Sequence, residues 1–96
     1  MGLATTQSVQ DRRSGLAFYV SATVYLDTTM LKEPDYRGVP VYVPVLRHEL
    51  GHVVGLDHVG DPDQMMHPSS SDVLTFKEGD LAGLAQLGEG ACAPGL

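Results

Sequence analysis

Three histidines and one glutamate in residues 48–58 have the types and spacing of a catalytic metal site. His48 and His52 are four residues apart, so on a helix they share one face and lie about one turn apart. Both rings can then reach one zinc ion at about 2.0–2.1 Å. Glu49 would lie beside the metal, where a carboxylate can take a proton from an activated water. His58 offers a third nitrogen, which leaves one coordination position open for water and substrate.

Gly55 is placed to let His58 return to the other two histidines. A glycine just past a helix end commonly adopts the left-handed conformation that turns the chain. The alternative is that the histidine pair marks only a partly exposed helix face, without a metal. Five residue types in register favour the metal site, because chance would supply this pattern at roughly one in a million starting points.

These residues resemble the extended zinc motif of the metzincin peptidases, which they match at every fixed position. The family also has a methionine turn beneath the metal, and Asp63 to Pro68 is similar to it. Within this segment Met66-His67-Pro68 resembles the Met-x-Pro sequence of the matrixin branch, so Met66 rather than Met65 is expected beneath the zinc. Asp80 to Leu84 resembles the start of the matrixin C-terminal helix. The resemblance covers residues from about 41 to 88.

The resemblance implies an α+β fold in which residues 1–96 are the C-terminal part of a matrixin-like catalytic domain, truncated at its N-terminus. Its parts would be a short sheet, a zinc-binding helix, a methionine turn and a C-terminal helix, with the zinc site within residues 48–68. The implied function is that of a zinc-dependent metalloendopeptidase. The implied site residues are His48, His52 and His58 as ligands of one catalytic zinc ion, Glu49 as general base, and Met66 and Pro68 in the structural methionine turn.

The same resemblance implies protein or peptide substrates and an extracellular location. It leaves room for calcium as a second ion, although the sequence shows no ligand set for it. Two other functions are compatible with the sequence. The chain could be an inactive zinc-binding remnant, with too little sheet to hold a substrate. It could also be a non-catalytic interaction fragment whose histidine helix is structural. Zinc without hydrolysis would distinguish the first, and absence of stoichiometric zinc would support the second.

Composition and charge limit the classes of protein to consider. The 96 residues are 43% hydrophobic and 19% charged, which is typical of one small globular domain. A net charge of −6 argues against nucleic acid and anionic membrane surfaces as partners. No apolar run reaches membrane-spanning length, and the N-terminus has no signal-peptide pattern. Cys92 is the single cysteine, so the chain cannot form an internal disulfide.

The clearest strand pattern before the motif lies in residues 16–27. Apolar and polar side chains alternate there, and the apolar face, which should pack on the zinc helix, consists of Phe18, Val20, Ala22, Val24 and Leu26. The polar residues 5–15 predict a loop. By the resemblance, Met1 to Ala4 would be the tail of an edge strand along which substrate lies. Asp27 is predicted to cap a short turn.

The zinc helix is predicted to begin at Pro44, because the first helical position does not need the N–H that proline lacks. It should end near Val54, and its predicted anchoring residues are Val45, Leu46, Leu50, Val53 and Val54. The last helix is predicted to begin with a capping box of Thr75 and Glu78 and to end at Gly88. Asp80 either ties this helix to the methionine turn or is a solvated first-turn carboxylate. His67 is expected to point away from the site.

Overall fold

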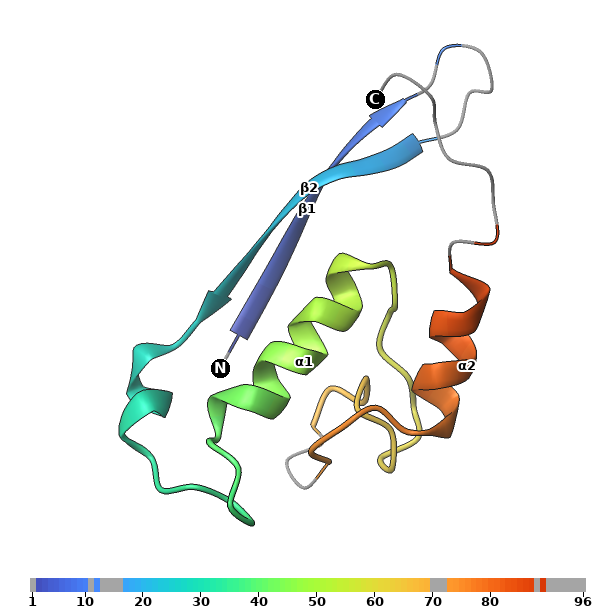
Figure 1. The fold of residues 1–96 in the computed structure, drawn as a ribbon. Helices are drawn as coiled ribbons and strands as arrows, with labels where there is room; N and C mark the ends of the chain where they lie inside the picture. Colours follow the sequence, from blue (N-terminus) through green and yellow to red (C-terminus); the bar gives the residue numbers. More distant parts are fainter. Residues whose placement is uncertain (1, 11, 13–16, 70–72, 88, 90–96) are drawn as a thin grey trace.

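Strands come first along the chain and helices follow (Figure 1). The computed structural model describes residues 2–10, 12, 17–69, 73–87 and 89. Within these residues the elements are β1 (Gly2–Gln10), β2 (Ala17–Leu26), the 3-10 helix η1 (Thr28–Lys32), α1 (Tyr42–Val53) and α2 (Glu78–Gln86). The predicted α+β fold, with a short sheet, a histidine-bearing helix and a C-terminal helix, is confirmed. Neither described α-helix has the length and apolar character needed to span a bilayer.

β1 and β2 form an antiparallel pair, in which Gly2 lies opposite Leu26 and Gln10 opposite Ala17. The prediction of a loop was therefore wrong for residues 5–10, whereas residues 11 and 13–16 lie outside the described part of the chain. Side chains of β1 are exposed on both faces except for a half-buried Ala4. The backbone groups of β1 are satisfied by pairing with β2, and neither of its faces is buried. A strand of this kind does not need alternating apolar and polar residues. Gly2 to Ala4 lie in this strand, and Met1 lies outside the described residues.

The alternation predicted for β2 is visible at its C-terminal end. Val24 and Leu26 are half-buried, whereas Tyr25 between them is 57% exposed. Ala22 is exposed, and the side chains of Phe18 and Val20 lie outside the described part.

The start of η1 is capped as the sequence predicts. Asp27 accepts hydrogen bonds at Oδ1 from the backbone N–H of Thr29 at 3.0 Å and from its hydroxyl at 2.9 Å. These two donors hold the pKa of Asp27 below its usual value.

α1 begins two residues earlier than predicted, at Tyr42, so Pro44 is its third residue. This is compatible with proline because the first four N–H groups of a helix have no partner inside it. The predicted anchoring was wrong for Leu50 and Val54, which are 44% and 50% exposed. In Figure 1 the hairpin lies along one side of α1 only, so this sheet leaves part of the helix surface uncovered.

A buried apolar cluster lies at the methionine turn, and Met30 in η1 is also buried. Met65, Met66 and Val73 form a buried cluster against which Leu56 and Phe76 pack. α2 follows this cluster and begins with Lys77 as its N-cap. The predicted Thr75–Glu78 capping box is wrong, because Asp80 is the residue whose carboxylate accepts the Lys77 N–H, at 2.8 Å. α2 ends at Gln86, and Gly88 lies outside the described residues.

Candidate metal centre

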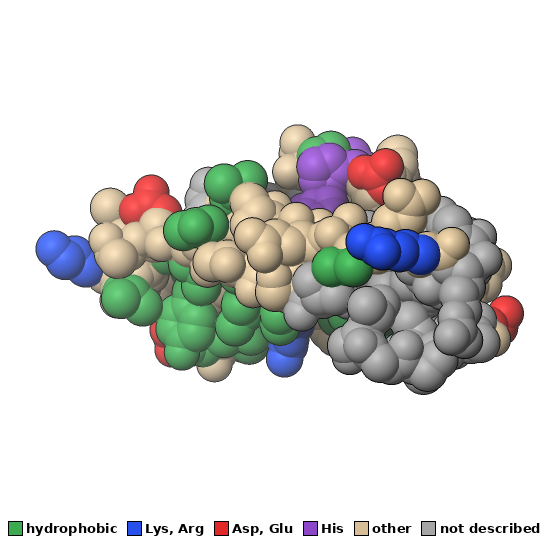
Figure 2. All heavy atoms as spheres, turned by 90° about the horizontal axis from the view of Figure 1, so that it is seen from above, with side chains coloured by type: hydrophobic (Ala, Val, Ile, Leu, Met, Phe, Trp, Pro, Cys, Tyr) green, Lys and Arg blue, Asp and Glu red, His purple; other side chains and the backbone are tan. Residues whose placement is uncertain are grey.

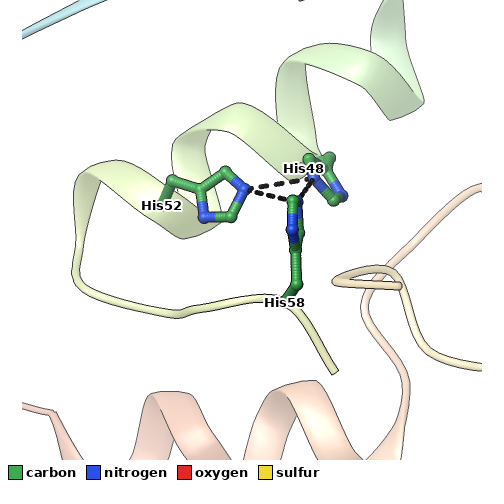
Figure 3. Close-up of side chains that lie close together, drawn as sticks. All are labelled: His48, His52 and His58. Atoms are coloured by element: carbon green, nitrogen blue, oxygen red, sulfur yellow. Dashed lines mark hydrogen bonds between the residues drawn. The ribbon is translucent and has the colours of Figure 1, made fainter. Parts of the chain in front are cut away.

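The side chains of His48, His52 and His58 converge on one point beside α1 (Figure 3). Their Nε2 atoms form a nearly equilateral triangle, with separations of 3.2 Å for His48–His52, 3.3 Å for His48–His58 and 3.1 Å for His52–His58. Two of the rings come from α1, and the third comes from the extended segment after it. The structure therefore brings together the three residues that the sequence predicts as ligands.

Backbone carbonyls hold the first two rings by their other nitrogen. His48 Nδ1 lies 2.7 Å from the carbonyl oxygen of Met65, and His52 Nδ1 lies 2.8 Å from that of Leu56. A carbonyl can only accept, so Nδ1 carries the hydrogen in both rings. With the hydrogen on Nδ1, a neutral ring has its lone pair on Nε2, and both Nε2 atoms face the shared point. This arrangement, with Nδ1–H on a carbonyl and Nε2 free, is characteristic of metal-binding histidines.

The chain reversal after α1 positions both Leu56 and His58. Gly55 has a φ of 116°, in the region that favours glycine, as the sequence predicts. Its N–H donates to His52 O at 3.0 Å, while the Leu56 N–H donates to Gly51 O at 2.9 Å. This pair of bonds is a Schellman motif. It turns the Leu56 carbonyl back to the His52 ring and starts the return of His58.

The geometry of the three nitrogens fits zinc. Nitrogens at 2.0–2.1 Å from a tetrahedral zinc ion lie about 3.3–3.4 Å apart, close to the observed separations. The Nε2 atoms of His48 and His52 lie 3.2 Å apart, and a cation bound between them would offset the repulsion of their lone pairs. With three protein ligands, a tetrahedral ion keeps one position open, as catalytic zinc sites do.

Glu49 is buried beside these histidines, with 6% of its surface exposed. The start of β1 lies close to it: a Cβ atom built on Gly2 would be 3.0 Å from Glu49 Cγ and 3.3 Å from Oε2. Glu49 and the three histidines line one cavity. A carboxylate in that position is able to exchange a proton with a water molecule in the cavity.

Both methionines of the predicted turn are buried, at 2% for Met65 and 1% for Met66. A Cβ atom built on Gly51 would overlap the Met66 sulfur, so this glycine allows the side chain to pack directly against α1. Met65 supplies the carbonyl for His48 and also lines the cavity. The sequence favoured Met66 over Met65 beneath the metal, whereas in the structure each of the two residues has its own contact with the site.

Asp80 ties α2 to this turn, which decides between the two interpretations of the residue. It is 2% exposed, and its carboxylate accepts the backbone N–H groups of Met65 at 2.7 Å and Met66 at 3.0 Å. The Lys77 N–H is a third donor. The carboxylate therefore fixes the backbone that carries the His48 acceptor.

The cavity in front of the histidines has a volume of about 920 Å³. It lies between the start of β1, α1 and residues 67–69, and its walls include Pro68. Figure 2 shows the histidine side chains reaching the molecular surface as one group. His67 also lines the cavity, and the expectation that its ring points away from the metal site stays a prediction. Among the described residues it is not one of the grouped metal-binding candidates, which are His48, His52 and His58.

The sequence is similar to a known protein family and to individual proteins. The family model described as Matrixin matches residues 9–88. The chain belongs to the matrixin family. Matrilysin of Felis catus is 36% identical over 58 residues, covering 55% of this chain and 22% of that protein. Macrophage metalloelastase of Oryctolagus cuniculus is 32% identical over 72 residues, covering 71% of this chain and 15% of that protein. No solved structure matches.

This matrixin chain thus spans less than a quarter of the length of either relative. The family assignment agrees with the zinc motif and the methionine turn read from the sequence. Sequence reasoning missed three parts of the site: the Met65 and Leu56 carbonyls that hold the rings, and the position of His67 in the wall. A carbonyl belongs to every residue and so gives no signal. The Met66-His67-Pro68 segment indicated that His67 lies near the site, but it gave no signal for the direction of its ring.

Proposed function

We propose that this matrixin chain is the zinc-binding part of a zinc-dependent metalloendopeptidase. The observation that carries the proposal is the convergence of three Nε2 atoms, two of them held by carbonyls at Nδ1. In this proposal His48, His52 and His58 are the ligands of one zinc ion, and Met66 and Pro68 belong to a structural methionine turn. The catalytic residue is Glu49. Residues 1–96 would then form part of one catalytic domain.

Zinc in a site of this kind acts as a Lewis acid that lowers the pKa of a coordinated water to about 7 and polarises a carbonyl group. The Glu49 carboxylate, buried against Gly2, takes the proton of the attacking water at one of its oxygens and passes it to the leaving amine. The carbonyls of Met65 and Leu56 keep the two α1 imidazoles oriented during these steps.

The substrate would lie along β1. Gly2, Leu3, Ala4 and Thr6 line the cavity, and among the described residues β1 pairs only with β2. An extended peptide can add to the other edge through main-chain hydrogen bonds, which position its carbonyl without reading its sequence. This mode of binding supports protein or peptide substrates.

The test compares the native chain with Glu49→Gln, using Glu78→Gln as the matched control. Glutamine keeps the size of the side chain but cannot accept the proton, so zinc content should stay at about one equivalent while hydrolysis of an unstructured protein falls by about 10²–10⁴-fold. Glu78 is exposed on α2 and lies outside the cavity lining, so its variant should match the native chain. Activity retained by Glu49→Gln would refute the assignment of the general base.

A zinc-binding remnant without activity is the second candidate function. It is favoured by the small sheet: the described part of the chain has a two-stranded sheet, and a two-stranded hairpin is only marginally stable by itself. One equivalent of zinc in the native chain with no hydrolysis would support this function and contradict the first. A non-catalytic interaction fragment has less support, because a purely structural helix has no need of converging imidazoles.

A further inference from the structure

His67 differs from His48 and His52 in the role of its Nδ1 atom, which accepts a hydrogen bond instead of donating one. The backbone N–H of Ser69 donates to His67 Nδ1 at 3.1 Å. An N–H can only donate, so Nδ1 is the acceptor and a neutral ring must carry its hydrogen on Nε2. The His48 and His52 rings have the opposite tautomer, with the hydrogen on Nδ1. His67 is therefore unsuited to join them as a ligand through Nδ1, and its Nε2–H remains as a donor.

The character of the cavity that His67 lines restricts which groups can bind beside this residue. His67 is half-buried in the wall of the cavity, whose other lining residues include the apolar side chains Val41, Pro44, Val45 and Leu74. A group that enters there loses water, so an unpaired acceptor or donor would be costly. Glu33 and Glu49 also line the cavity, and its lining has no lysine or arginine among the residues that the structure describes. An anionic group would therefore meet like charges from the protein.

We propose that His67 is a specificity-determining residue, which selects substrates whose side chain in this cavity has an apolar stem and ends in a neutral hydrogen-bond acceptor. Among the common amino acids, glutamine has this chemistry. Its methylene groups contact the apolar wall, and its Oε1 accepts from His67 Nε2–H. The proposal rests on the proposed function, because it requires a peptide to occupy the cavity.

Peptide hydroxamates provide the test, because the hydroxamate binds the metal and fixes which side chain follows it into the cavity. Two such peptides differ only in that side chain, which is glutamine in one and norleucine, a hydrocarbon of similar length, in the other. Their dissociation constants are measured for the zinc-loaded native chain, His67→Phe and His67→Gln. Phenylalanine keeps a ring but has no donor, whereas glutamine at position 67 keeps an N–H donor of similar reach.

The expected result is that His67→Phe lowers the preference for glutamine over norleucine by about two- to tenfold, the worth of one neutral hydrogen bond. His67→Gln should retain most of the preference. An unchanged preference in His67→Phe, or an equal loss in both variants, would overturn the proposal. Cleavage of a glutamine peptide is measured separately. Failure to cleave it while the preference depends on His67 would contradict the peptidase function alone.

Discussion

Replacing Asp80 with asparagine should weaken both the fold and the zinc site. The carboxylate is buried and accepts three backbone N–H groups, two at Oδ2 and one at Oδ1. Asparagine keeps one acceptor oxygen, so at least one N–H must face its amide hydrogens, and the remaining bonds lose their charge assistance. Asp80→Asn would lose one charge-assisted hydrogen bond and leave its buried N–H donor unpaired. We expect this to lower the free energy of unfolding by about 2–4 kcal/mol.

The effect on zinc follows from a chain of contacts. Asp80 holds the Met65 N–H, and the Met65 carbonyl holds the His48 ring. Loss of a group that orients a ligand typically weakens metal affinity by about 10–100-fold. Asp80 acts one residue further away, through the backbone, so the expected weakening is about tenfold, at the lower end of that range.

Urea denaturation of the metal-free chain and zinc competition with a chelator measure the two effects of Asp80→Asn. Glu78→Gln is the control, because it removes an exposed carboxylate from the same helix turn and changes the charge equally. A control effect of about 0.3–1 kcal/mol would be the helix-dipole contribution alone. If Asp80→Asn destabilises no more than this control, the three hydrogen bonds do not stabilise the turn. Lower stability with unchanged zinc affinity would refute the link through Met65.

Three further predictions concern the ligands, the methionine turn and acid stability. His58→Ala should lose most of its zinc in metal analysis after dialysis, because two imidazoles remain; full retention would refute the third ligand. Met66→Leu nearly conserves volume, so it should keep zinc and cost less than about 1.5 kcal/mol in denaturation, and a histidine-like loss of zinc would contradict its packing role. The folded pKa of Asp27 is lowered by Thr29, so its stabilising effect is present above the unfolded pKa and lost as pH falls through the folded pKa. Asp27→Asn should remove that part of the pH dependence, and an unchanged acid limb would refute it.

Local geometry explains why the sequence alone predicted that the three histidines converge. A four-residue spacing places His48 and His52 on one helix face in any α-helix. Gly55 identifies the end of that helix because few other residues tolerate its positive φ. Asp27 could also be predicted as a cap, because its hydrogen-bond partner Thr29 is two residues away. In each case the interacting groups are so near in sequence that the helix or turn itself brings them together.

Tertiary structure decided the features that depend on distant segments. The polar residues of β1 became a strand because β2 pairs with them, and nothing in their own pattern shows this. Leu50 and Val54 are apolar, yet their exposure depends on how far the sheet extends over α1. Sequence left Asp80 between two roles, since its Met65 and Met66 partners lie 15 and 14 residues away.

The tautomers of the histidines show the same division. The sequence determined that three imidazoles can meet at one point, because helix periodicity and one glycine suffice for that. Only the folded chain determined the tautomer of the His48 ring, because the Met65 carbonyl that accepts from its Nδ1–H lies 17 residues away. The physical reason is that a ring's direction depends on the backbone group that reaches it, and every residue carries such groups.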